Sequence, residues 1–265
     1  MNYGLYTAYL GMRARLRTVE VIANNVANAS TTGFKADSLY YRSIEAAELE
    51  AARLAVQGDT TAAQPNDPAA GANAAPALLP SRALGVVSGG MMDFSTGSLR
   101  QTGRSLDVAL EGDGFLVIQT PRGERYTRDG ALTLDVNGQL VTARGDLVVG
   151  EGGPITVRPG EVSIGEDGRI KVAGQEMGQL KLVRFQTPRT ALSKEGDSLF
   201  VATGSEQPQA ATQTYVRQGM LESSNVNPVG EMAALMQNNR EFEALQRSVT
   251  LLMSMRKIVT EIGRI

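Results

Sequence analysis

Histidine and cysteine are both missing from this chain of 265 residues. Without histidine the chain lacks the side chain that most often serves as a general base near neutral pH, and it lacks a common metal ligand. Without cysteine it has no thiolate nucleophile and forms no disulfide. Carboxylate, lysine and serine side chains remain available for chemistry. The absences therefore disfavour an enzyme, a metal site and a cofactor site without excluding them.

The sequence has neither a surplus of one charge nor a long apolar run. Its 26 basic and 28 acidic side chains leave a net charge of -2, whereas a nucleic-acid binder concentrates positive charge to displace phosphate counterions. No run of about 18 apolar residues occurs that would span a membrane. Residues 1–5 lack the basic and apolar blocks of a secretory leader. We therefore expect no nucleic-acid partner and no membrane insertion, and any export would proceed without a cleaved signal peptide.

Apolar side chains recur with a helical period at both ends of the chain. They form two seams, which are rows along one helix face with spacings of three, four or seven residues. The seams predict helices that pack against other helices as coiled coils. Packing within a single domain is the alternative, but two seams that flank a different region favour assembly between chains. The first seam contains Leu5, Tyr9, Met12, Leu16, Val19, Ala23 and Val26, and the second contains Leu235, Phe242, Leu245, Val249, Leu252 and Val259.

The middle of the chain has two different compositions. Residues 57–83 consist mainly of Ala, Pro, Gly, Asn, Asp and Thr, which bury too little apolar surface to offset the entropy of ordering, so we expect a flexible linker. Residues 84–216 contain short apolar strands between glycine-rich turns, and Asn137-Gly138 predicts a hairpin with a type I′ turn. The expected fold class is α+β. In it, residues 1–56 and 217–265 form a discontinuous helical assembly domain that flanks an antiparallel β domain.

Three motifs follow one another in the order expected of a known family. An Asn-Asn-aliphatic-Ala-Asn run ends in Thr-x-Gly-Phe-Lys at residues 24–35, a β segment covers 106–117 and 126–130, and Leu-Glu-Ser-Ser-Asn-Val-Asn occupies 221–227. Together they resemble the flagellar basal-body rod and hook proteins. The resemblance implies a non-enzymatic structural subunit of the torque-transmitting rod, with sister rod proteins and its own copies as partners. It also implies export by the flagellar type III apparatus and assembly in the periplasm.

Short polar residues and a glycine within the terminal motifs form the predicted assembly motif. Amide side chains near a helix end can bind backbone groups or neighbouring chains. Without the resemblance, ordinary helix termination is the simpler interpretation. Methionines in the C-terminal helix suit either a core or an interface that repacks. The predicted motif residues are Asn24, Asn25, Asn28, Thr32, Gly33, Phe34, Ser224, Asn225 and Asn227.

Several alternatives stay open at this point. Residues 148–155 and 178–183 are most similar to the proximal rod type, and the distal rod type is the nearest alternative. A carboxylate-based hydrolase needs only a pair of acids, and Asp107, Glu111 and Asp113 are close in sequence. Residues 135–138 and 166–168 loosely resemble loops with oxygen ligands for calcium, although ordinary turns explain both.

Overall fold

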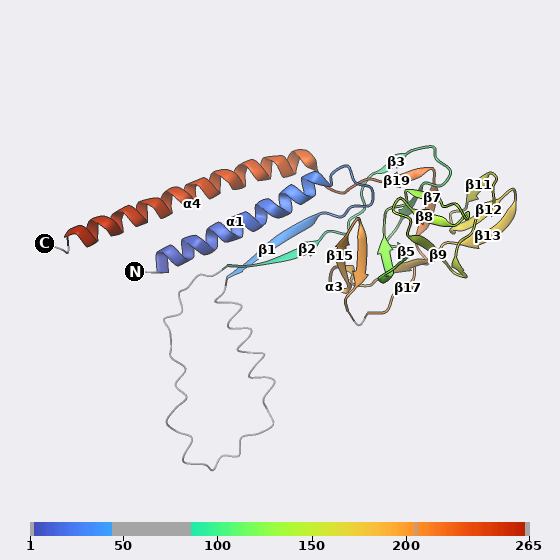
Figure 1. Ribbon diagram of the computed structural model, residues 1–265, viewed down its shortest axis with the longest axis horizontal. Helices are drawn as coiled ribbons and strands as arrows, with labels where there is room; N and C mark the ends of the chain where they lie inside the picture. Colours follow the sequence, from blue (N-terminus) through green and yellow to red (C-terminus); the bar gives the residue numbers. More distant parts are fainter. Residues whose placement is uncertain (1–2, 44–85, 205, 263–265) are drawn as a thin grey trace, which may run out of the picture. The chain divides into compact units, whose positions relative to one another are not determined.

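The computed structural model describes residues 3–43, 86–204 and 206–262 (Figure 1). The chain divides into two compact units, each assembled from separate segments. We call the first the helical unit, with residues 1–22, 39–90 and 232–265, and the second the β unit, with residues 23–38 and 91–231. The linker expected at 57–83 lies outside the described residues. The fold is mixed α+β, with a helix at each end of the chain and antiparallel strands between them.

Two long helices, α1 (Tyr3–Ala27) and α4 (Pro228–Ile262), come from the two ends of the chain. They run side by side in the helical unit (Figure 1), where Arg15 pairs with Glu241 at 2.7 Å. α4 begins as the sequence predicts, with Asn227 Oδ1 accepting a hydrogen bond from the Gly230 amide at 3.2 Å. Among the described residues, no helix is long and apolar enough to cross a membrane.

Strands in the β unit pair antiparallel throughout its described part. A ribbon of β1 (Asp37–Ser43) and β2 (Val86–Met92) precedes them in the chain, and a short helix, α3 (Pro188–Ala191), follows β14. The remaining strands are β3 (Leu99–Gln101), β4 (Val108–Glu111), β5 (Phe115–Thr120), β6 (Gly123–Thr127), β7 (Leu132–Leu134), β8 (Leu140–Thr142), β9 (Leu147–Gly150), β10 (Gly153–Pro154), β11 (Val162–Ile164), β12 (Arg169–Val172), β13 (Gln175–Gln179), β14 (Leu182–Arg184), β15 (Leu192–Gly196), β16 (Leu199–Ala202), β17 (Gln209–Ala210), β18 (Tyr215–Gln218) and β19 (Met220–Glu222).

The largest sheet has ten strands, and its main path runs β15-β16-β6-β5-β9-β8-β7. β10 pairs with β9, and β14 pairs with both β5 and β17. A three-stranded sheet, β11-β12-β13, and the pairs β18-β4 and β19-β3 complete the unit. β19, the last strand before α4, therefore pairs with β3, the first strand of the β unit.

Strand β5 lies between two apolar clusters. Leu116 and Ile118 point into one cluster, and Phe115 and Val117 point into the other. Successive side chains of a strand point to opposite faces, so the run of four apolar residues buries both faces of β5. Phe200 joins the aromatic cluster, with its ring centroid 5.8 Å from that of Phe115. These clusters form the core of the β unit.

The hairpin expected around Asn137-Gly138 is present between β7 and β8, but its predicted turn type is wrong. Gly138 has a φ of 75°, whereas Asn137 is not among the residues with positive φ, and a type I′ turn needs both. The loop is longer because the Asp135 carboxylate accepts hydrogen bonds from the amides of Asn137 at 2.9 Å and Gln139 at 2.7 Å. These bonds lower the pKa of Asp135, chiefly the bond from Gln139. The aspartate organises the turn.

Candidate functional site

The two terminal motifs meet inside the β unit. The Gly33 amide donates to the Glu222 carbonyl at 2.9 Å, and the Asn225 amide donates to the Phe34 carbonyl at 3.4 Å. The Asn225 side chain accepts from the Ala36 amide at 2.7 Å and donates to the Asp93 carbonyl at 2.8 Å. Residues far apart in sequence are thereby held together by backbone and amide hydrogen bonds. We call this region the junction network.

Three charged side chains form the centre of the junction network. Lys35 Nζ lies 2.6 Å from Glu222 Oε1, and Arg128 Nη1 lies 3.3 Å from Glu222 Oε2. All three side chains are almost fully buried. Burial lowers the pKa of Lys35, although the adjacent Glu222 opposes the shift. A single carboxylate thus contacts cations from two other parts of the chain, and it also accepts a hydrogen bond from the Gly97 amide at 2.9 Å.

Gly33 occupies a position that has no room for a side chain. Its φ is 64°, in the left-handed region that favours glycine. A Cβ there would lie 2.4 Å from the Asp129 nitrogen and 2.5 Å from the Arg128 carbonyl carbon. Beside it, Thr32 Oγ1 donates to Asp129 Oδ1 at 2.7 Å. Burial raises the pKa of Asp129, and the hydrogen bond from Thr32 opposes that shift. Both conformation and space therefore require glycine here.

Asn25 is buried and uses both ends of its amide. Its Nδ2 donates to the Asp37 carbonyl at 2.8 Å and to Glu231 Oε1 at 3.1 Å, while Oδ1 accepts from the Asp37 amide at 2.9 Å. The last turn of α1, the start of β1 and the first turn of α4 all belong to the β unit. One side chain therefore connects the inner ends of both helices.

Phe34 is buried in the β unit beneath a lysine from β15. Lys194 Nζ lies 4.1 Å from the centre of the Phe34 ring and 2.7 Å from Asp37 Oδ2, and it also donates to the Lys35 carbonyl. Burial lowers the pKa of Lys194, and Asp37 opposes the shift. In this chain the aromatic ring is thus covered by a cation from its own β unit.

The other predicted motif residues make local contacts. Asn28 Nδ2 donates to the carbonyl of exposed Asn24 at 2.9 Å, which is an ordinary helix-end contact. Ser224 Oγ accepts from the Val226 amide at 3.2 Å, and Asn227 caps α4. The structure therefore brings Asn25, Thr32, Gly33, Phe34 and Asn225 into one network and leaves Asn24, Asn28, Ser224 and Asn227 in local roles.

Only some of the predicted seam residues are shielded from solvent in the single chain. The contact between α1 and α4 includes Arg15 and Asn238, whose Nδ2 donates to the Arg15 carbonyl at 2.9 Å, and a Cβ at Gly11 would lie 3.7 Å from Leu245 Cδ1. The side chains of Leu5, Leu252 and Val259 lie outside the described ones. Tyr9, Leu16 and Ala23 are exposed, whereas Met12, Val19, Val26, Leu235, Phe242, Leu245 and Val249 are partly buried.

Large apolar side chains remain exposed on both helices. Their exposed fractions range from 49 % for Met232 to 77 % for Val229. We call these residues the exposed apolar set. It contains Tyr9, Leu16, Val229, Met232, Met236, Leu251, Met253 and Met255.

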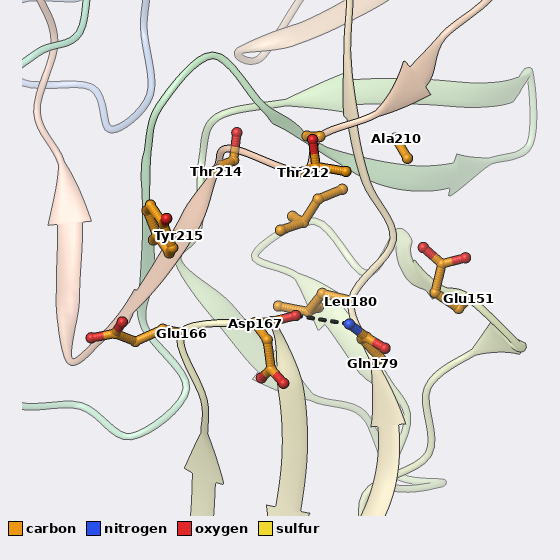
Figure 2. A pocket seen from close by; sticks show the side chains of 11 residues that line it. Glu151, Glu166, Asp167, Gln179, Leu180, Ala210, Thr212, Thr214 and Tyr215 are labelled. Atoms are coloured by element: carbon orange, nitrogen blue, oxygen red, sulfur yellow. Dashed lines mark hydrogen bonds between the residues drawn. The ribbon is translucent and has the colours of Figure 1, made fainter.

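A surface depression of about 430 Å³ in the β unit gathers several polar side chains (Figure 2). Two of its carboxylates are paired with arginines, since Glu166 lies 2.5 Å from Arg217 and Asp167 lies 3.1 Å from Arg169. Gln179 Nε2 donates to the Asp167 carbonyl at 2.9 Å, the bond drawn in Figure 2. Within the described ranges, no group of three or more acidic side chains is arranged to hold a metal ion. In the depression, Glu166 and Asp167 are therefore held in ion pairs at turns of the β unit.

The three acids of the hydrolase alternative have structural partners or lie in a turn. Asp107 is buried and accepts from Thr102 Oγ1 at 2.7 Å, and Glu111 pairs with Arg217 at 2.8 Å. Asp113 lies between β4 and β5. The structure therefore shows a charged junction network and two long helices that carry exposed apolar side chains.

Comparison with known proteins assigns the chain to a family. Residues 5–35 match the family model described as "Flagella basal body rod protein", and residues 109–172 match "Flagellar hook protein FlgE/F/G D1 domain". Residues 217–261 match "Flagellar basal body rod FlgEFG protein C-terminal". The chain belongs to the flagellar basal-body rod protein family. It is a structural subunit of the rod and not an enzyme, so the hydrolase alternative has no support.

Relatives of both rod types align with nearly the whole chain. The flagellar basal-body rod protein FlgF of Caulobacter vibrioides is 33 % identical, over 93 % of this chain and 92 % of the relative. FlgF of Salmonella typhimurium is 34 % identical over 94 % of each chain. FlgG of Agrobacterium fabrum is 32 % identical over 97 % of this chain and 98 % of the relative. The chain is thus located in the basal body, where rod proteins assemble with one another.

Sequence reasoning missed the charged centre of the junction network. Lys35 and Glu222 lie inside the two quoted motifs, but lysine and glutamate are almost never fully buried without a partner, so surface positions were the natural expectation. Their position within motifs otherwise rich in small polar residues was the available signal. Arg128 likewise lies inside a quoted motif, the β segment at residues 126–130.

Proposed function

We propose that the chain is a proximal rod subunit of the FlgF type and that it polymerises through α1 and α4 as coiled coils with sister subunits and copies of itself. The distal type, FlgG, is the alternative. Residues 148–155 and 178–183, together with the FlgF relatives, support the proximal type. The observation that carries the assembly role is the exposed apolar set on the helices.

The physical reason is that, within one chain, the side chains of the exposed apolar set remain largely in contact with solvent and would be stabilised by burial. Burying a large apolar side chain contributes about 2 kcal/mol. Eight such side chains are at least 49 % exposed on α1 and α4, which is unusual for elements that carry no binding role. Packing against helices of neighbouring subunits would cover them. The predicted seam residues that are partly buried would then extend the same contacts.

The test replaces exposed apolar residues with charged ones in the full-length chain. Leu16→Asp and Met236→Asp should each leave the free energy of unfolding within about 0.5 kcal/mol of the original, because both side chains are exposed. Incorporation into purified basal bodies should fall more than about tenfold, since one lost apolar contact of about 2 kcal/mol exceeds that factor.

Val136→Asp is the matched control. Val136 is a fully exposed apolar residue at the β7–β8 turn of the β unit, outside both helices. Its replacement introduces the same charge and should leave incorporation unchanged. Normal incorporation of the Leu16 and Met236 variants would remove the proposed role of the helices.

Export belongs to the same proposal. Family membership supports passage through the flagellar type III apparatus into the periplasm without removal of a signal peptide. In cells that lack this apparatus, the chain should stay in the cytoplasm. Its mass in purified basal bodies should equal that of the chain retained in those cells. A shortened N-terminus or export by cells without the apparatus would contradict this part alone.

A further inference from the structure

Methionine is concentrated on the exposed surface of α4. Met236 is 64 % exposed, Met255 55 %, Met253 52 % and Met232 49 %. The remaining exposed methionine of the described residues is Met91, at 40 % in the β unit. By contrast, other described methionines are partly buried, namely Met12, Met92, Met177 and Met220. Solvent therefore reaches the thioethers of α4 most readily.

Met232 and Met236 lie away from the contact with α1. Met232 and Met236 are four residues apart and share one helix face. Asn238, which is buried against Arg15, is two residues beyond Met236 and so points about 200° away from it. All four methionines of α4 are exposed to solvent. They belong to the exposed apolar set, which the proposed function places against neighbouring subunits.

We propose that Met232, Met236, Met253 and Met255 are a site of reversible two-electron oxidation by hydroperoxides in the unassembled chain. A sulfur lone pair attacks one peroxide oxygen, the O–O bond breaks, and a sulfur–oxygen bond forms. The sulfur is oxidised by two electrons. The second peroxide oxygen leaves as hydroxide, or as alkoxide from an organic hydroperoxide, and takes the proton of the transferred oxygen to give water or an alcohol. Exposure governs which methionines react first, because the thioether has no ionisable form to tune.

The consequence for assembly rests on the proposed function. A sulfoxide is polar and chiral, so its formation turns an apolar contact surface into one that retains water. Four such changes along one helix would prevent subunits from packing while leaving the β unit intact. Methionine sulfoxide reductases return the thioether, so the block is reversible. Assembly would then protect the same sulfur atoms by covering them.

Peptide mapping of the folded full-length chain tests the site itself. Hydrogen peroxide is the probe, and oxidation is counted as one oxygen atom added to each methionine peptide. The four methionines of α4 should oxidise at least about fivefold faster than Met12, Met92, Met177 and Met220. Equal rates across the two groups would overturn the proposal. This measurement does not depend on whether the chain assembles.

Sedimentation of the full-length chain with purified sister rod proteins tests the consequence. Peroxide treatment should reduce co-sedimentation at least about tenfold, and treatment with MsrA and MsrB should restore it. The variant with Met→Leu at all four positions keeps apolar side chains of similar size and should assemble equally well before and after peroxide. Met91→Leu, the matched control, should give no protection.

Each result separates the proposals. Unchanged assembly of the oxidised wild-type chain, or loss of assembly in the oxidised four-leucine variant, overturns the oxidation proposal while the proposed function stands. Failure of the untreated chain to assemble contradicts the proposed function instead, and peptide mapping alone then decides the oxidation site.

Discussion

The β unit and the helical unit bury their side chains in opposite ways. In the β unit, Phe115 and Leu116 lie on opposite faces of one strand and are both buried, and even Lys35 and Glu222 have buried partners. In the helical unit, Arg15 and Glu241 pair at the contact between helices that expose large apolar residues. The β unit buries apolar and charged side chains within a single chain, whereas the long helices leave large apolar side chains exposed. Substitutions in the two units should therefore fail differently.

The largest expected effect comes from Glu222→Gln. The substitution removes the one carboxylate that contacts both Lys35 and Arg128, so two buried cations lose their charged partner. Breaking a buried pair in this way costs about 3–5 kcal/mol of unfolding free energy, measurable by chemical denaturation. Lys35→Met is the matched control, because it leaves Arg128 and Glu222 as a balanced pair. An equal or larger loss in the control would show that charge balance is not what the network supplies.

Gly33→Ala should have the next largest effect. Its Cβ would meet the backbone of Arg128 and Asp129 in a conformation that side chains disfavour, so we expect a loss of about 3 kcal/mol. Gly145 also has a positive φ, but nothing lies within 4 Å of its would-be Cβ. Gly145→Ala should therefore cost only about 1 kcal/mol. If thermal melts give similar losses for both variants, the close approach at Gly33 is unimportant.

A smaller effect is expected in the helical unit from Arg15→Ala. The Arg15–Glu241 pair is partly exposed, with 40 % and 37 % of the two side chains accessible. Solvent weakens such pairs, so the helical signal in a circular-dichroism melt should lose at most about 1 kcal/mol of stability. Arg17→Ala, which removes an exposed pair with Glu20 on α1, is the control and should change less. A loss of several kcal/mol for Arg15→Ala would mean that the helices are held together as tightly as the β core.

Asp129→Asn should give the smallest change in the free energy of unfolding at any single pH. Its effect should appear instead in how that free energy depends on pH. Because burial raises the pKa of Asp129 above its ordinary value of 3.8, the folded state binds more protons than the unfolded state between the two values. Its stabilising contribution is present below pH 3.8 and is lost as pH rises through the folded value.

Asparagine keeps an acceptor for Thr32 and the Ala131 amide but carries no charge to bury. The variant should therefore show a flatter dependence of unfolding free energy on pH over that window. Denaturation curves at several pH values would measure it. A steeper dependence in Asp129→Asn than in the original chain would contradict the raised pKa.

The helices and the β region could be predicted from local sequence because their signals are local. The Asn227-Pro228 cap marks the start of α4 without reference to any distant residue. Which face of α1 contacts α4 could not be predicted in the same way. Periodicity predicts that Leu16 faces a partner helix, yet Arg15 is the residue that contacts α4. Arg15 pairs with Glu241 and hydrogen-bonds to Asn238. Gly11, which has no side chain, lies close to Leu245 of α4.

Long-range polar contacts were beyond the sequence patterns. Nothing in the local pattern around Lys35 indicates that its partner lies 187 positions further along. Likewise, the expected assembly segment at residues 1–56 groups residues 23–38 with the N-terminal helix, whereas hydrogen bonds join them to the β unit. The motif residues were identified as important from resemblance, and their physical roles became visible only through their partners. For Asn137, the preceding Asp135 changed the turn by accepting two amide hydrogen bonds.

The position of Glu222 has a consequence for timing. Lys35 and Arg128 precede it by 187 and 94 residues, so both cations are synthesised well before the carboxylate that pairs with them. Contacts that close such long loops form late in folding, because the chain loses the entropy of loop closure before the contact contributes any stabilisation. A chain truncated before Glu222 would lack the carboxylate that contacts Lys35 and Arg128, so burial of these two cations would be unfavourable. The charged centre of the β unit is thus completed only by β19, the last strand of that unit.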